Sequence, residues 1–494
     1  MAFVQNFPFF CILLALITAV VTSVLSSSKA RLVTLAMLTL SVILNAAVML
    51  YTLRTGESYV YLMGHFPAPW GNEIRAGILE TVSATLLSLV VLLSFIGGDR
   101  DSRLEIDPWK YNLFCILVDL TLLSMLALIY TNDLFTGYVF IEINTLAAAG
   151  LVVARQDGKS LVASVRYMIM NLLGSSLFLI GVVLIYTITG HLLMVPIREQ
   201  IAKLAVSEAY WVPLTVVVSL IGVGLGMKSA LYPFEKWLPG AYGNATPTAA
   251  ALLSSIVSKG YIFLLIKVLV RVIGLDVVRE LGICNVLFIF GAVGMIMGSV
   301  NAIRSQTTKM MVAYSSVAQI GYIFLALGIG TQAGMVAALF HTLSHSAAKA
   351  MLFLSSAELD HASGETGLRR NLRGGFYRAP EAAVCFTIGS FSLVGVPFLP
   401  IFVSKLLIGQ AAIAAGGVRM MMALACLTVS TVLNVLYFMV TAVTLYLPDN
   451  KEERRRPDPA LLLGMVGLAV LNIALGLGTF GLVSALNRGI MNFM

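Results

Sequence analysis

Ionisable side chains inside long apolar stretches are the residues of this sequence that could do chemistry. An ionised group at the centre of a membrane span costs about 2.5–3.5 kcal/mol, so such residues usually mark an ion, proton or substrate pathway. Lysines and histidines in that setting could hold and pass on protons, and carboxylates could pair with them. The positions that qualify are Glu80, Asp119, Glu142, Lys228, Lys259, Lys267, His341, His345, Lys349 and Lys405.

The strongest candidates have long apolar flanks or stand beside a visible helix break. Lys267 and Lys349 lie nearer span ends, where a lysine can extend its ammonium to the interface. Glu80 and Asp119 are lone carboxylates, and each either faces a neighbouring subunit, belongs to a second ion path, or pairs with a polar group nearby. The candidates that remain strongest are Glu142, Lys228, Lys259 and Lys405.

A buried lysine beside a carboxylate can act as a proton switch. Burial makes the ammonium easier to deprotonate, and a nearby carboxylate opposes that effect. A Glu142–Lys228 pair would hold the proton, and drawing the two groups apart would release it. Lys259, His345 and Lys405 could then relay the proton, provided that each lies within hydrogen-bond reach, or one water molecule, of the next.

The elements that position these groups are predicted to be membrane-spanning helices. Apolar residues make up 59% of the 494 residues and charged residues only 11%, whereas a soluble domain carries about 25% charged residues. Lipid must therefore cover most of the exterior, and apolar runs predict an all-α polytopic protein with about fourteen spans. The predicted spans are residues 7–27, 32–53, 76–97, 111–130, 134–153, 163–189, 210–231, 245–272, 281–303, 310–330, 333–356, 382–412, 420–446 and 459–484.

The distribution of Lys and Arg predicts the orientation of these spans. Basic residues concentrate in the loops after odd-numbered spans, including Arg369, Arg370 and the run Arg454–Arg456. Because cytoplasmic loops carry an excess of Lys and Arg, both termini are expected on the non-cytoplasmic side of a prokaryotic inner membrane. The net charge of +8 is explained in the same way and does not indicate nucleic acid.

Two of the strongest lysines stand at predicted helix interruptions. Residues 226–234 (GMKSALYPF) break the seventh span, and 395–400 (GVPFLP) break the twelfth, just before Lys405. Corresponding Gly/Pro-interrupted spans in two halves of a transporter indicate inverted repeats. We therefore expect two five-helix repeats, spans 4–8 and 9–13. The expected division is residues 1–110 for the peripheral spans 1–3, 111–272 for the first repeat, 281–446 for the second and 459–494 for helix 14.

The sequence carries no motif for a cofactor. Its five cysteines are scattered, which excludes a cysteine-ligated iron–sulfur or zinc site of recognisable spacing. It has neither a GxxxxGK[ST] loop nor a GxGxxG turn for a nucleotide. No cofactor is therefore expected on this chain, and any energy source must be an ion gradient or a partner subunit.

A family resemblance appears in the segment from Gly226 to Tyr261, GMKSALYPFEKWLPGAYGNATPTAAALLSSIVSKGY. It resembles the most diagnostic stretch of the antiporter-like membrane subunits of respiratory complex I, Mrp cation/proton antiporters and membrane-bound hydrogenases. That stretch includes a lysine after an A-x-P motif, at the spacing from Pro247 to Lys259. Further segments match in order over about residues 110–440: YVFIE ending at Glu142, KMMVAYSSVAQIGY from Lys309, HTLSHSAAKAMLFL from His341, and Gly395 to Lys405.

The resemblance implies roles for individual residues. In that family a fifth-helix glutamate pairs with a seventh-helix lysine, and an eighth-helix residue connects them to a twelfth-helix lysine or glutamate. The corresponding positions here are Glu142, Lys228, Lys259 and Lys405. His345 and Lys349 match the eleventh-helix connecting residues, and Glu80, Asp119 and His341 are secondary candidates. Where the family often has histidine, this chain has Glu235 and Tyr242.

The resemblance also implies a function. We expect a subunit that translocates H⁺, with exchange for Na⁺ left open, in a complex with other antiporter-like and small membrane subunits. A redox-driven complex, such as a hydrogenase or an NADH or ferredoxin oxidoreductase, would add a peripheral iron–sulfur arm, because this chain has no recognisable redox or hydrolytic centre. The alternatives are a subunit of a stand-alone Mrp-type Na⁺/H⁺ antiporter and, from another class, a non-conducting structural subunit. Retention of the four charged positions argues against the structural subunit.

Overall fold

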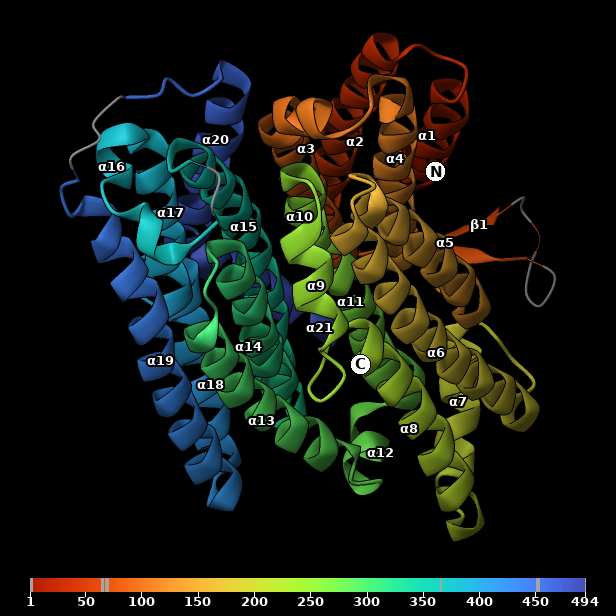
Figure 1. The fold of residues 1–494 in the computed structure, drawn as a ribbon. Coiled ribbons are helices and arrows are strands. Elements are labelled where there is room, and N and C mark those ends of the chain that lie inside the picture. Colours follow the sequence, from red (N-terminus) through yellow and green to blue (C-terminus); the bar gives the residue numbers. More distant parts are fainter. Residues whose placement is uncertain (1–2, 64–65, 67–70, 365–366, 450–453, 494) are drawn as a thin grey trace.

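The chain folds almost entirely into helices that pack side by side (Figure 1). The computed structural model describes residues 3–63, 66, 71–364, 367–449 and 454–493. Two short strands, β1 (Tyr59–Leu62) and β2 (Glu73–Ala76), form an antiparallel pair that projects from the helices near the N-terminus. This pair was not predicted from the sequence, because its strands are too short to show a clear alternation of apolar and polar residues.

Eleven helical segments of the described chain are long and apolar enough to cross a membrane, judged by length and composition. They account for most of the predicted spans and establish an integral membrane fold. They are Phe3–Thr22 (with α1, Phe7–Thr22), α2 (Ser27–Thr55), α3 (Ile78–Glu105), Pro108–Tyr130 (with α4, Tyr111–Tyr130), α5 (Leu134–Val153), α6 (Gly158–Thr189), α8 (Trp211–Lys228), α13 (Ile283–Arg304), α14 (Thr308–Gly328), α19 (Gly417–Tyr446) and α20 (Pro459–Leu477).

The remaining helices are shorter, interrupted or less apolar. A π-helical segment, Leu253–Val257, links α10 to α11, and a second one, Val268–Ile273, follows α11. The α-helices of this shorter, interrupted or less apolar kind are α7 (Met194–Leu204), α9 (Trp237–Asn244), α10 (Pro247–Leu252), α11 (Ser258–Lys267), α12 (Leu275–Glu280), α15 (Gln332–Ala362), α16 (Gly375–Arg378), α17 (Pro380–Val394), α18 (Pro400–Ala415) and α21 (Thr479–Met491).

Helices occupy every stretch that was predicted to span the membrane, so the predicted all-α membrane architecture is confirmed. The number of fourteen spans and the division into inverted repeats stay predictions. Several boundaries differ from the prediction: α1 ends at Thr22 and α2 begins at Ser27, where 27 and 32 were predicted, and the last predicted span divides at Gly478 into α20 and α21. The second part, α21, turns back against α3, where Gly489 lies against Leu79.

Two helices end in the middle of apolar sequence, at the places where glycine and proline interrupt it. α8 ends at Lys228 and is followed by the irregular segment 229–236. α17 ends at Val394, and α18 begins at Pro400. Gly395 terminates α17 with φ of +93°, a conformation that glycine adopts without strain. Non-helical backbone at membrane depth must be buried in protein or line a hydrated cavity.

α15 is the central helix of the molecule. Every residue from Gly334 to Leu359 is buried, and the helix packs against α3, α10, α14, α17, α18, α20 and α21. In Figure 1 it belongs to the α13–α19 group of helices, on the side that faces the α5–α11 group. His341, His345 and Lys349 all lie on this helix. The centre of the protein therefore contains ionisable side chains that no lipid contacts.

Candidate functional site

The predicted site residues lie on five helices that follow one another across the molecule. Glu142 lies on α5, Lys228 ends α8, Lys259 lies on α11, His345 on α15 and Lys405 on α18. Lys228, Lys259 and His345 are buried, and Glu142 and Lys405 are half-buried. α11 packs against both α8 and α15, and α15 packs against α18. The structure thus brings residues that are far apart in sequence into one series of packed helices.

Lys228 contacts α5 through a hydroxyl group. Its Nζ donates a hydrogen bond to Thr145 Oγ1 at 2.6 Å and lies 5.0 Å from the centre of the Tyr261 ring. Its position at the last residue of α8 places the ammonium at the negative end of that helix. A hydroxyl, a π face and a helix end together surround the charge in place of water.

Glu142 lies one turn before Thr145 on α5 but does not touch Lys228. Within the described chain, no ion pair of 4.0 Å or less joins the two side chains, and the buried Glu142 Oε1 atom has no hydrogen-bond partner. The direct Glu142–Lys228 pair suggested by the sequence is therefore replaced here by a Thr145–Lys228 contact. Glu142 is nevertheless within electrostatic reach of the Lys228 ammonium.

Hydrogen bonds between polar side chains lead from Tyr261, beside Lys228, through α5 to α4. The Tyr261 hydroxyl donates to Asn144 Oδ1 at 2.8 Å, and Asn144 Nδ2 donates to Ser124 Oγ at 2.8 Å. Sequence reasoning missed these neutral residues. Tyr261 ends the motif that begins at Gly226, and Asn144 follows Glu142 by two residues. Their closeness in sequence to charged candidates is the feature that could have indicated them.

Lys259 lies directly after the π-helical segment. Its Nζ donates to the carbonyl of Ser254 inside that segment, and to Ser258 Oγ at 3.2 Å. The Tyr242 hydroxyl donates to the carbonyl of Leu253 at 3.0 Å. A π-helical turn disturbs the regular hydrogen-bond ladder of an α-helix, and such turns are frequent at functional sites. Here the disturbed carbonyls accept from the two side chains.

His345 and His341 lie between Lys259 and Lys405. His345 is within electrostatic reach of Lys259, Lys349 and His341, and neither of its ring nitrogens has a partner in the described chain. The His341 and His345 rings are stacked with centroids 6.2 Å apart. Because buried polar atoms ordinarily find a partner, two free ring nitrogens in the centre of the protein indicate a place that can accept and donate protons.

His341 connects this centre to the second helix break. Its Nδ1 lies 2.5 Å from Ser404 Oγ on α18, and its ring stacks on Tyr322 at 5.5 Å. Lys405 Nζ lies 5.2 Å from the centre of the same Tyr322 ring. Ser404 and Tyr322 are further residues that sequence reasoning did not single out. Together they place His341 and Lys405 around one aromatic ring.

Lys405 is held by the end of a broken helix. Its Nζ donates to the carbonyl of Val394, the last residue of α17, at 2.7 Å, and to Thr431 Oγ1 at 3.1 Å. A Cβ atom added to Gly395 would lie 3.3 Å from Nζ, so glycine there permits the close approach. The helix break frees a carbonyl that would otherwise be bonded within α17, and Lys405 uses it. Lys228 and Lys405 thus both lie at the negative end of an interrupted helix.

Lys349 binds the neighbouring helix α14. Its Nζ donates to the carbonyl of Val312 at 2.7 Å and to Ser315 Oγ. Both acceptors belong to the segment that begins at Lys309 and carries the family resemblance. The ammonium is also within electrostatic reach of Lys259. Lys349 therefore lies at the side of the series, between α14 and α11.

Glu80 and Asp119 lie apart from this series. Glu80 accepts from Arg75 Nη1 at 2.5 Å and from the Gly77 N–H at 3.1 Å, which caps the start of α3. Asp119 accepts from Thr34 Oγ1 on α2 at 3.2 Å. In the described chain neither carboxylate makes a hydrogen bond or ion pair with a residue of the series. Glu80 is thus held by β2 and the start of α3, and Asp119 by α2.

The chain matches a model of a known protein family over more than half of its length. Residues 131–431 match the model described as NADH:quinone oxidoreductase/Mrp antiporter, transmembrane. This range contains every member of the series from Glu142 to Lys405.

Named relatives and solved structures agree with this match. NADH-quinone oxidoreductase subunit N of Desulforudis audaxviator is 32% identical, over 85% of this chain and 82% of that protein. The D-type Na⁺/H⁺ antiporter subunit of Alkalihalophilus pseudofirmus is 27% identical, over 84% and 82%. A chain of the membrane-bound sulfane sulfur reductase, an archaeal respiratory membrane complex, aligns with a TM-score of 0.88 and 25% identity over 99% of this chain and 97% of that one. A chain of the Mrp complex from Dietzia aligns with a TM-score of 0.84 and 22% identity, over 100% and 98%, which shows the shared fold.

Proposed function

Because this chain belongs to the NADH:quinone oxidoreductase/Mrp antiporter family of transmembrane proteins, we propose that it translocates protons as one subunit of a multisubunit membrane complex. Exchange of H⁺ for Na⁺ is the variant of this activity that the similarity to an Na⁺/H⁺ antiporter subunit favours. The observation that carries the proposal is the series of ionisable groups from Glu142 through Lys228, Lys259, His345 and His341 to Lys405, of which the two ends are half-buried and the other four are buried. An integral membrane chain has no structural need for such a series.

In this proposal the chain's own residues hold and pass on the proton. Lys228 keeps its proton while the Glu142 carboxylate is near, and the ammonium shown here on Thr145 is the separated state, ready to release it. Lys259 receives the proton, and the free nitrogens of His345 pass it to His341. Lys405 then takes it at the end of α17. Each step needs groups within hydrogen-bond reach or one water molecule of each other.

The parent complex is also part of the proposal. Its other members would be antiporter-like and small membrane subunits, because the similar solved chains belong to multisubunit complexes. A peripheral iron–sulfur arm would drive translocation in a redox complex, and a stand-alone Mrp-type complex would lack that arm. The chain is placed in a prokaryotic inner membrane with both termini on the non-cytoplasmic side, on the distribution of its Lys and Arg residues.

Purification of the tagged chain with its partners tests the proposal. Mass spectrometry of the co-purified subunits is expected to find other antiporter-like subunits, and a hydrogenase-like or NADH-oxidising subunit would identify a redox complex. Small hydrophobic partners alone would identify the Mrp-type complex. The same preparation, reconstituted in vesicles and supplied with its driving reaction or an Na⁺ gradient, should move protons. If an intact complex moves no protons in either condition, the remaining alternative is that this chain is a non-conducting structural subunit.

Thr145→Val is expected to slow translocation by about tenfold. The change keeps the size of the side chain but removes the acceptor of the Lys228 ammonium. Loss of a hydrogen bond to a charged group is worth about 1.5–3 kcal/mol, and 1.4 kcal/mol corresponds to a factor of about ten. Thr145→Ser keeps the hydroxyl and should preserve the rate. Initial rates of pH change in vesicles carrying the complex measure both, and equal rates for the valine and serine variants would show that Thr145 has no part in the relay.

A further inference from the structure

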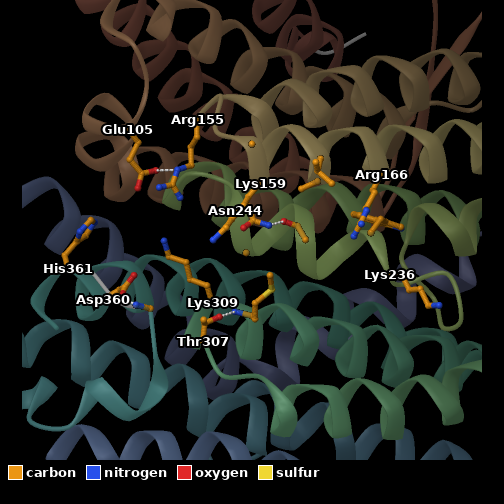
Figure 2. A pocket seen from close by; sticks show the side chains of 18 residues that line it. Glu105, Arg155, Lys159, Arg166, Lys236, Asn244, Thr307, Lys309, Asp360 and His361 are labelled. Carbon is orange, nitrogen blue, oxygen red and sulfur yellow. Dashed lines mark hydrogen bonds and ion pairs between the residues drawn. The ribbon is translucent and has the colours of Figure 1, made fainter. Parts of the chain in front are cut away.

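A second polar site lies away from the series, in a pocket of about 700 Å³ between the two groups of helices (Figure 2). Its walls come from the beginning of α6, from α9, from the beginning of α14 and from the end of α15. Among the described residues, five basic side chains and two carboxylates line it. The basic residues are Arg155, Lys159, Arg166, Lys236 and Lys309.

Most of these cations are exposed and make no direct contact with a described carboxylate or acceptor. Lys159, Arg166, Lys236 and Lys309 make no side-chain hydrogen bond or ion pair with any residue that the structure describes. The two carboxylates of the pocket are already engaged. Glu105 pairs with Arg155 at 3.5 Å, and Asp360 accepts from the Gly367 N–H at 2.5 Å. Glu105 is also within electrostatic reach of Lys309, and Glu235 of Lys236, but the described lining of the pocket keeps an excess of positive charge.

Two helix starts also line the pocket. Asp157 caps α6 by accepting from the Ser160 N–H at 2.6 Å, and Thr307 caps α14 by accepting from the Met310 N–H at 3.3 Å. The first turn of each helix lines the pocket. The positive end of the α14 dipole thus adds to the ammonium and guanidinium groups, whereas the Asp157 carboxylate offsets that of α6. Charges of one sign around one cavity repel each other unless an anion lies among them.

The geometry points to a phosphate-bearing anion, and we propose that this pocket binds one, supplied either by a phospholipid headgroup or as free phosphate. Arg and Lys are the side chains that bind phosphate oxygens, Arg through its planar fork and Lys as a point charge. The volume exceeds what a halide needs. Val162, Ala163 and Met310 give the pocket an apolar part as well, which suits the glycerol end of a lipid. The pocket also opens among the loops rich in Lys and Arg that are predicted to face the cytoplasm, where anionic headgroups lie.

Such an anion would connect the two groups of helices. Arg166 and Lys236 belong to the α5–α9 side, whereas Lys309 extends from α14 on the opposite side (Figure 2). Trp237, which lines the pocket, donates from Nε1 to the carbonyl of Met227 at 3.1 Å. Met227 directly precedes Lys228. An occupied pocket would therefore stabilise the contact between the two groups of helices next to the first relay lysine.

The test uses the complex purified in detergent through a tag on this chain. The temperature at which the tagged chain precipitates is followed while dioctanoyl phosphatidylglycerol, dioctanoyl phosphatidylcholine or inorganic phosphate is added. Phosphatidylglycerol or inorganic phosphate should raise that temperature, and phosphatidylcholine should not. In the double variant Lys236→Gln/Lys309→Gln the concentration needed should rise at least about tenfold, because one lost charge-assisted hydrogen bond already corresponds to that factor.

A matched variant separates the pocket from a general effect of surface charge. Lys29→Gln removes an exposed lysine on the same predicted side of the membrane, outside the pocket, and should respond as the unmodified chain does. Stabilisation by the lipid alone identifies the headgroup as the source, and stabilisation by inorganic phosphate alone identifies the free anion. The proposal is overturned if neither probe stabilises the chain, or if the double variant responds like Lys29→Gln. Both variants remove only positive charge at the surface, so the baseline precipitation temperature reports directly whether they fold.

Discussion

Replacing Lys228 by methionine is expected to reduce ion translocation by about a hundredfold or more, the usual size of an acid–base group's contribution. Methionine fills nearly the same volume but cannot hold a proton, so the Thr145 hydroxyl loses its donor and the Glu142 carboxylate loses the positive charge within its electrostatic reach. The site is fully buried at the end of α8. Removing a buried charge also removes its desolvation cost, so the variant should assemble. Proton movement in vesicles, with a native gel of the complex, measures both properties.

Lys267→Met is the matched control for this prediction. Lys267 is equally buried, but its ammonium donates to the carbonyls of Ile129 and Thr131 at the end of α4, outside the series. Because both variants lose a buried lysine, a general destabilisation would affect them alike. The relay predicts that only Lys228→Met loses translocation in an assembled complex. Retained translocation in Lys228→Met would remove the basis of the proposed function.

The other large effect is expected from Lys405→Met. Lys405 is the last ionisable group of the series and the only side chain in the described structure that donates to the Val394 carbonyl at the end of α17. Its loss should reduce translocation by about a hundredfold, while assembly is retained because the neighbouring backbone bonds of Gly395 to Phe391 and Ser392 remain. The same vesicle assay and native gel apply.

Thr431→Val provides the control for Lys405. It removes one acceptor of the ammonium but leaves the charge and the Val394 bond in place. Translocation should then fall by much less than in Lys405→Met. If Lys405→Met instead prevents assembly, the lysine serves mainly to hold the broken helix together, and the series would have to end at His341. Equal losses in the two variants would show that Thr431, and not the charge, is what the site requires.

The helices were predictable from the sequence because lipid requires long apolar runs. α5 begins and ends at the predicted residues 134 and 153, and both interrupted helices end beside the predicted Gly/Pro segments. The π-helical segment Leu253–Val257 was not predictable, because its residues are ordinary for an α-helix and its geometry depends on the acceptors used by Lys259 and Tyr242. The division of the last span at Gly478 depends on packing against α3 in the same way.

The site was predictable in its charged members and not in its neutral ones. Glu142, Lys228, Lys259 and Lys405 stand out because a charge in an apolar run is costly. Thr145, Ser404 and Tyr322 are residue types that occur throughout apolar helices, so only the fold shows that each contacts a charged or histidine side chain. The sequence also favoured a direct pair of Glu142 with Lys228, whereas the structure places a hydroxyl on the ammonium. A choice between two acceptors one turn apart depends on a rotamer, which sequence does not encode.

The complete burial of α15 has a consequence for how the protein is made. A typical membrane helix can leave the translocon by itself, without its neighbours, because its apolar surface is stable in lipid before its partners arrive. α15 is not among the segments apolar enough for this, and from Gly334 to Leu359 it has no surface for lipid to contact. Its histidines and Lys349 become stable in the bilayer only when α14, α17 and α18 cover them. Biogenesis of this chain therefore couples insertion to tertiary packing, so that the helix that carries the central proton acceptors enters the membrane together with its neighbours.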